Sequence, residues 1–176
     1  MTPTRIVRYV TTLLALLIVT GCTDVVLDPL SPDEVRRQVT DVSRQIVSDL
    51  GGEIVEAKLL YDSCGINGKP PFKGHGKLYL WMPGADRTRE VTAESVTQRL
   101  HQHGWATNPD FHSHALAFER DGHDVTVQVI PQPKSGKKPF AHVLVDVYGE
   151  CRDTFDHRTD GSAFSSIDIS SDVTPG

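Results

Sequence analysis

Residues 114–130 read HALAFERDGHDVTVQVI, and this stretch decides the fold class. Apolar and polar residues alternate through Val125, Val127 and Val129, which is typical of a strand with one buried face. Asp121-Gly122 lies between two such runs and is a strong signal for a β-hairpin, because both residue types accept the backbone angles of a tight turn. The stretch therefore predicts two antiparallel strands, at 114–119 and 123–130.

The segments on either side extend this hairpin into a sheet with helices. Ser31-Pro32-Asp33-Glu34 combines a helix cap, a proline suited to the first turn and a capping-box glutamate. An apolar stripe follows it as far as Gly51, and a second helix is expected from Thr92 to Gly104. Further strands are expected at 53–64, 77–82 and 141–150, with a loop at 65–76. This order predicts an α+β fold: an antiparallel sheet of about four to five strands with two helices packed on one face.

Cys22 marks the boundary between a leader segment and the folded part. Arg5 and Arg8 precede the apolar run 10–19, which is too short to span a membrane and has the length of a signal-peptide core. The run leads into Val19-Thr20-Gly21-Cys22, the pattern of a bacterial lipobox, in which diacylglycerol is attached to the cysteine thiol. The alternatives are an ordinary signal peptide or a short uncleaved anchor. We expect a signal peptide at 1–21, lipidation of Cys22 and a protein held at the outer face of the cell membrane.

Length and charge indicate a single acidic domain. The 176 residues carry a net charge of −5, and removal of Arg5 and Arg8 with the signal peptide makes it −7. An acidic surface argues against nucleic-acid binding, which needs a basic one. Residues 22–30 read as a tether and 31–158 as one α+β domain. The tail 159–176 is rich in Ser, Asp and Gly, and we expect it to be disordered.

The two remaining cysteines, Cys64 and Cys151, form an even remainder once Cys22 is assigned to lipid. In an exported protein this suggests a disulfide, and the alternative is two separate thiols that act as small buried hydrophobes. Neither cysteine has a second one nearby, so a zinc site is not indicated.

Two loops are basic in an otherwise acidic chain and are candidates for contact with anionic lipid or cell-wall polymer. The candidate contact residues are Lys69, Phe72, Lys73, Lys134, Lys137 and Lys138. The alternative is that these lysines are ordinary solvated loop residues.

The eight histidines are the richest set of candidate catalytic groups. In an extended segment His112 and His114 would lie on one face and could share a metal, but no third ligand is evident. No nucleophile elbow, redox pair or phosphate-binding loop is present in the sequence. We expect no metal and no cofactor, and a non-enzymatic binding or interaction module. The alternative is an envelope hydrolase or metal-dependent enzyme that uses a histidine cluster.

The chain resembles small lipoproteins of mycobacteria and related actinobacteria, close to the LppA-like group. The resemblance is carried by the lipobox, by Tyr61-Asp62-Ser63-Cys64-Gly65 leading into Pro70-Pro71-Phe72, by Gly104-Trp105 and by Gly149-Glu150-Cys151. It implies a lipid-anchored envelope protein, a cystatin-like α+β fold and a disulfide between Cys64 and Cys151. It implies no activity. The membrane, through the acylated cysteine, is the one partner that it indicates, and protein partners stay unknown.

Overall fold

The computed structural model describes residues 28–111, 114–130 and 140–176. Cys22, the tether up to residue 27 and the basic loop 131–139 lie outside the described residues. The elements are α1 (Pro32–Leu50), β1 (Glu53–Ser63), η1 (Ile66–Gly68), β2 (Phe72–Trp81), α2 (Ala93–Gln102), β3 (Ala106–Thr107), β4 (Leu116–Arg120), β5 (His123–Val129), β6 (Val143–Tyr148), η2 (Ser162–Phe164), β7 (Ile167–Asp168) and α3 (Ser170–Val173).

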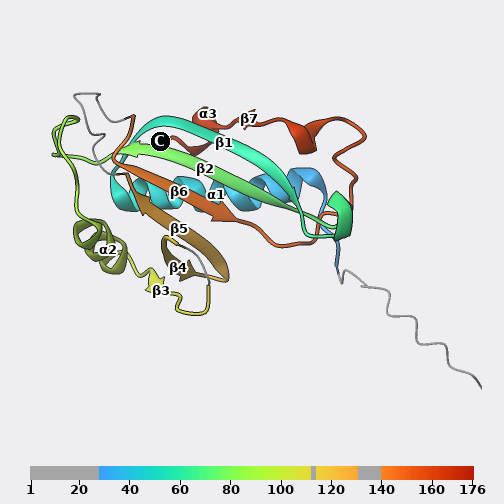
Figure 1. The fold of residues 1–176 in the computed structure, drawn as a ribbon, viewed down its shortest axis with the longest axis horizontal. Coiled ribbons are helices and arrows are strands. Elements are labelled where there is room, and N and C mark those ends of the chain that lie inside the picture. Colours follow the sequence, from blue (N-terminus) through green and yellow to red (C-terminus); the bar gives the residue numbers. More distant parts are fainter. Residues whose placement is uncertain (1–27, 112–113, 131–139) are drawn as a thin grey trace, which may run out of the picture.

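The sheet has the strand order β3-β4-β5-β6-β2-β1-β7, and every pairing is antiparallel (Figure 1). Five of the strands have five residues or more, which confirms the predicted α+β class; β3 and β7 are two-residue additions. The hairpin at Asp121-Gly122 joins β4 to β5, with both residues at positive φ. Strand β6 then enters between β5 and β2, so the chain returns to the centre of the sheet.

Helix α1 forms as its sequence predicts and crosses one face of the sheet (Figure 1). Ser31 and Glu34 make the capping box, and Gly51 ends the helix at φ 60°. Its buried stripe includes Val35, Val39, Ile46 and Leu50, all fully inaccessible. The remaining helices flank α1, with Arg99 of α2 donating to the Leu50 carbonyl at 2.8 Å and Arg36 of α1 pairing with Asp172 of α3 at 2.6 Å.

Strand β2 begins earlier than the sequence predicts, at Phe72 rather than Lys77. The glycines that favour a loop are instead packing positions under α1. A Cβ on Gly74 would lie 2.7 Å from Cγ2 of Val39, and one on Gly76 would lie 2.8 Å from Cγ1 of the same valine. The missing side chains let the helix approach the middle of the sheet, so these glycines mark close packing within a strand.

The C-terminal segment 159–176 is ordered, and the prediction of a disordered tail is wrong. β7 pairs with the edge of β1, with Lys58 opposite Asp168 and Leu59 opposite Ile167. Ile169 and Val173 are fully buried in the core. These elements have only two and four residues, so they produce no periodic apolar pattern that sequence reading could detect. Within the described residues, no helix has the length and apolar character needed to cross a bilayer.

Candidate functional site

The disulfide Cys64–Cys151 is present and ties the end of β1 to the segment that follows β6, with 6.0 Å between the Cα atoms. It closes a loop of 87 residues. The chain-entropy model assigns such a loop about 4–5 kcal/mol of stabilisation. The bond fixes one end of the sheet, where several segments far apart in sequence meet.

The described chain begins at this same end, which we call the tether end (Figure 1). Leu30 donates its backbone N–H to the Arg152 carbonyl at 2.9 Å and forms a bridge with Asp153. The Arg152 guanidinium contacts the backbone carbonyl of Asp28 at 2.8 Å and its carboxylate at 2.7 Å. The first described residues are thereby held next to the disulfide.

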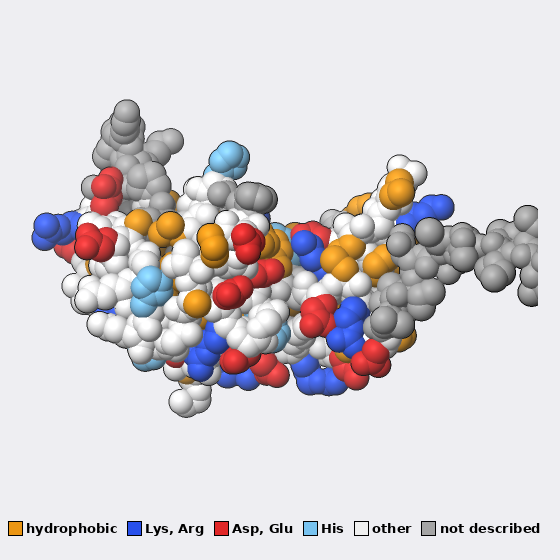
Figure 2. Space-filling view, turned by 90° about the horizontal axis from the view of Figure 1, so that it is seen from below, with side chains coloured by type: hydrophobic (Ala, Val, Ile, Leu, Met, Phe, Trp, Pro, Cys, Tyr) orange, Lys and Arg blue, Asp and Glu red, His pale blue; other side chains and the backbone are white. Residues whose placement is uncertain are grey.

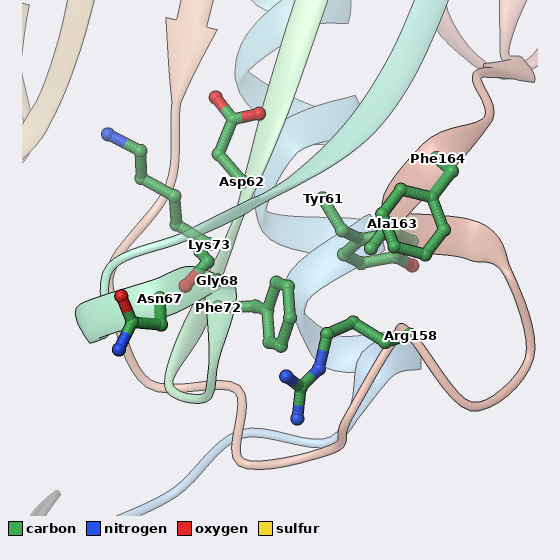
Figure 3. A pocket seen from close by; sticks show the side chains of 10 residues that line it. Tyr61, Asp62, Asn67, Gly68, Phe72, Lys73, Arg158, Ala163 and Phe164 are labelled. Atoms are coloured by element: carbon green, nitrogen blue, oxygen red, sulfur yellow. The ribbon is translucent and has the colours of Figure 1, made fainter.

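A pocket of about 580 Å³ opens at the tether end, between β1, η1 and the C-terminal segment (Figure 3). This volume lies in the range of small-molecule sites. Its lining is formed by Tyr61, Asp62, Ser63, Asn67, Gly68, Phe72, Lys73, Arg158, Ala163 and Phe164. Three of these residues are aromatic, and five others have polar or charged side chains, so the lining combines apolar and polar surface.

Arg158 is the cation that lies beside the aromatic groups of this pocket. Arg158 extends into the view from the C-terminal segment, whereas the Lys73 amine points away from Phe164 (Figure 3). The Lys73 amine lies over the Tyr148 ring instead, 4.9 Å from its centroid. Arg158 makes a two-pronged pair with Asp156, and this hydrogen bonding lowers the pKa of the Asp156 carboxyl to about 2.

A buried histidine forms the support beneath the pocket. The His157 ring stacks on Tyr61 at 3.7 Å between centroids and meets the Phe72 ring edge-on at 5.2 Å. Its Nε2 lies 2.7 Å from Oδ2 of Asp153, and Nδ1 lies 2.6 Å from Oγ of Ser162. Asp153 is fully inaccessible and His157 is 2% exposed. We call Asp153, His157 and Ser162 the sealed cluster, which fastens the C-terminal segment to the sheet.

The order Ser–His–Asp invites comparison with hydrolase triads, in which the serine proton passes to the histidine. Here the Ser162 hydroxyl lies 2.6 Å from Oδ1 of Asp160, a carboxylate that can only accept. The single hydroxyl proton is thus donated to Asp160, and Ser162 accepts from the His157 Nδ1–H. In this arrangement Ser162 has no base to activate it, and the cluster acts as a structural clamp.

A second histidine cluster lies on the opposite face of the sheet, because side chains alternate along β1 and β2. His75 Nδ1 is 2.8 Å from Oδ2 of Asp62, and Nε2 is 2.7 Å from Oδ1 of Asp146. The ring also stacks on Tyr148 at 4.6 Å. We call His75, Asp62 and Asp146 the open cluster. Both ring nitrogens face carboxylate oxygens, and a ring that donates to both of them is an imidazolium.

Burial and hydrogen bonding act in opposite directions on the open cluster. Burial disfavours the charged ring, but the bonds to Asp146 and Asp62 outweigh it, so the pKa of His75 is raised. The bond from His75 lowers the pKa of Asp62 in spite of the burial of that carboxyl. The two shifts stabilise the charged pair over a window of mildly acidic pH.

The residues predicted to form a basic contact surface do not lie together in the described part of the structure. Lys69 is exposed in the loop next to η1 and does not line the pocket. Phe72, which we expected in an exposed loop, is 1% exposed, because it starts β2 and faces the core. Lys134, Lys137 and Lys138 fall outside the described residues. The expected basic contact surface is therefore reduced to Lys69 and Lys73 among the described residues.

The described histidines do not converge. His75 and His157 lie on opposite faces, and His142 bonds to the Met82 backbone at 3.0 Å. Across residues 28–111, 114–130 and 140–176, no group of three His, Cys, Asp or Glu side chains is arranged to hold a metal ion. The predicted pairing of His112 with His114 lies outside the described residues, since His112 is not among them.

Sequence reading missed the sealed cluster and the C-terminal wall of the pocket. Asp153 and His157 are four residues apart, but they lie in a loop, and only the fold brings them under Tyr61 and Phe72. Phe164 was missed because 159–176 was expected to be disordered, whereas Arg158 ends the predicted domain 31–158 and no sequence pattern marks it.

Comparison with known proteins places this chain in a family. The family model described as "Putative lipoprotein LppJ" matches residues 31–171, which is nearly the whole described part of the chain. The chain belongs to the LppJ family. Proteins named "Putative lipoprotein LppJ" from Mycobacterium tuberculosis strain H37Rv and from Mycobacterium bovis are each 25% identical over 134 residues. The resemblance to mycobacterial lipoproteins is confirmed, with LppJ as the matching family.

The match covers 75% of this chain and 66% of those LppJ relatives, so it spans about two thirds of their length. No solved structure matches. The cystatin-like description of the fold therefore stays a prediction.

Proposed function

We propose that the protein is a lipid-anchored module of the cell envelope that binds an amphiphilic ligand in the tether-end pocket. The anchor is diacylglycerol on Cys22, at the outer face of the cell membrane. Support comes from the lipobox, from the family's description as a lipoprotein and from the disulfide, since disulfides persist in oxidising compartments outside the cytoplasm.

The position and lining of the pocket carry the binding proposal. The pocket is lined by the exposed ring of Phe164, by the largely buried Tyr61 and Phe72, and by Arg158, at the end of the molecule where the described chain begins. Such a lining suits a ligand with an apolar body and an anionic group. Anionic lipid and anionic cell-wall polymer are the two sources that a protein in this place would meet.

Hydrogen bonding favours binding over hydrolysis. Ser162 donates its proton to Asp160, and the buried pair of Asp153 and His157 is sealed beneath aromatic rings. The His75 ring is held between two carboxylates, and both of its nitrogens are occupied by these contacts. The contacts give His75 and His157 structural partners, and they support a module without a catalytic centre.

Titration with single-chain phospholipids below their micelle-forming concentration tests the proposal. We expect lysophosphatidylglycerol to bind more tightly than lysophosphatidylcholine. Arg158→Gln should lower the affinity for lysophosphatidylglycerol at least fivefold. Arg87→Gln is the matched control, because Arg87 is also an exposed arginine paired with one carboxylate, Glu53, but lies outside the pocket. Equal affinities for wild type, Arg158→Gln and Arg87→Gln would refute this pocket as the binding site.

A further inference from the structure

Large apolar side chains are exposed at the tether end on three separate segments. Ile66 is 85% exposed, Phe164 is 79% exposed and Phe155 is 42% exposed. They account for three of the five exposed large hydrophobic residues among those described. Figure 2 shows hydrophobic side chains at the end of the molecule where the described chain begins. We call Ile66, Phe155 and Phe164 the apolar tips.

The fold holds the apolar tips in place on this end. Ile66 starts η1, two residues after Cys64, which is bonded to Cys151. The Phe155 N–H donates to Oδ1 of Asp153 at 2.9 Å, and its ring meets His157 edge-on at 5.0 Å. Phe164 lies on η2 at the wall of the pocket. Exposed apolar groups on rigid supports at one end are typical of an interaction surface.

The tether limits what this surface can reach. Asp28 is six positions along the chain from Cys22, and a fully extended chain of that length spans at most about 20 Å. Asp28 is itself held against Arg152. An acyl chain on Cys22 would thus keep the tether end within about 20 Å of the bilayer surface.

We propose that the apolar tips insert into the interfacial region of the bilayer and orient the domain with its pocket toward the lipid. This inference rests on the proposed anchor at Cys22. The Arg152 guanidinium at this end is already paired with Asp28 and Glu150, and Arg158 belongs to the lining of the pocket. Apolar insertion therefore carries the contact, and its strength depends little on anionic lipid.

Tryptophan quenching by brominated lipid tests the orientation in the full-length protein. Phe164→Trp places an indole on an apolar tip, and Phe140→Trp is the matched control. Phe140 is also exposed, at 56%, but its ring meets Tyr79 of β2 at 5.1 Å between centroids. Tyr79 lies seven residues along β2 from Phe72, which is about 23 Å from the tether end. Both variants replace one aromatic ring with another, and both keep the native Trp81 and Trp105 as the same background.

Acylated protein is reconstituted in phosphatidylcholine vesicles with and without bromine on the acyl chains. We expect the added indole of Phe164→Trp to be quenched at least twice as strongly as that of Phe140→Trp. Adding 30% phosphatidylglycerol should change this ratio by less than twofold. Equal quenching of the two variants would overturn the proposal. Weaker quenching of Phe164→Trp than of Phe140→Trp, together with dimers in native mass spectrometry, would also overturn it, because a second copy of the chain would then cover the apolar tips.

Mass spectrometry of the N-terminal peptide separates failure of this inference from failure of the proposed function. If Cys22 is acylated and the two variants are quenched equally, the proposed orientation is wrong but the anchor stands. If Cys22 carries no acyl chain, the anchor is wrong, and the same protein added to preformed vesicles still decides the question. Stronger quenching at Phe164→Trp then supports insertion, and equal quenching overturns it.

Discussion

The sealed and open clusters use the same two residue types on opposite faces of one sheet. In the sealed cluster, His157 and Asp153 lie in the core, 2% and 0% exposed. In the open cluster, the His75 side chain keeps 11% of its surface accessible and Asp62 keeps 42%. The difference in burial gives the two histidine–aspartate pairs different properties. In the core water cannot replace a lost partner, whereas on the open face the pair responds to the pH of the solvent.

Removing the ring from the sealed cluster should have the largest effect. His157→Ala leaves the Asp153 carboxylate buried without its partner and opens a cavity beneath Tyr61 and Phe72. Breaking one side of a buried pair costs about 3–5 kcal/mol of unfolding free energy. Urea denaturation followed by circular dichroism measures it. His101→Ala, in an exposed helix position, is the control and should change little; a similar small loss at His157 would show that Asp153 does not depend on it.

Replacing the histidine of the open cluster should cost less. His75→Gln removes two charge-assisted hydrogen bonds, but water can solvate Asp62 and reach part of the site. We expect a loss of about 2 kcal/mol at pH 6, the scale of a hydrogen bond to a charged group. Urea midpoints measured beside His157→Ala would compare the two clusters directly. A larger loss for His75→Gln would contradict the role assigned to depth.

The open cluster should also give stability a pH dependence that the variant lacks. The raised pKa of His75 means that its contribution is complete below the unfolded value near 6.5 and is lost as pH rises through the folded pKa. The lowered pKa of Asp62 means that its contribution is complete above about 3.8 and is lost as pH falls through the folded pKa. The contribution of the open cluster to stability should therefore be highest between about pH 4 and 6.5. Subtracting the His75→Gln curve from the wild-type curve isolates this term, and a flat difference would refute it.

The two clusters also show how far sequence reading extends. Local signals predicted α1 from Ser31 and Glu34, and the β4–β5 hairpin from Asp121-Gly122, because the residues that define these elements are neighbours in the chain. The strand position of His75 was not predicted, because Gly74 and Gly76 are typical of a loop and their packing against α1 is visible only in the fold. The sealed cluster depends on a C-terminal segment whose few apolar residues become buried only when they pack against β1 and α1. Tertiary contacts, not local propensity, decide both places.

Removing the hydroxyl of the sealed cluster should have the smallest effect and gives the sharpest account of its chemistry. Ser162→Ala takes one acceptor from the Nδ1–H of His157 but leaves the Asp153 bond intact. The expected loss of unfolding free energy is about 1 kcal/mol, the usual worth of one hydrogen bond. A fluorophosphonate probe adds a second readout, since it labels only a serine whose proton a base removes. Because Ser162 donates to Asp160, we expect no adduct on the wild-type peptide, with trypsin labelled in parallel as a positive control. An adduct on Ser162 would mean that the proton passes to His157, and would turn the clamp into a nucleophilic relay.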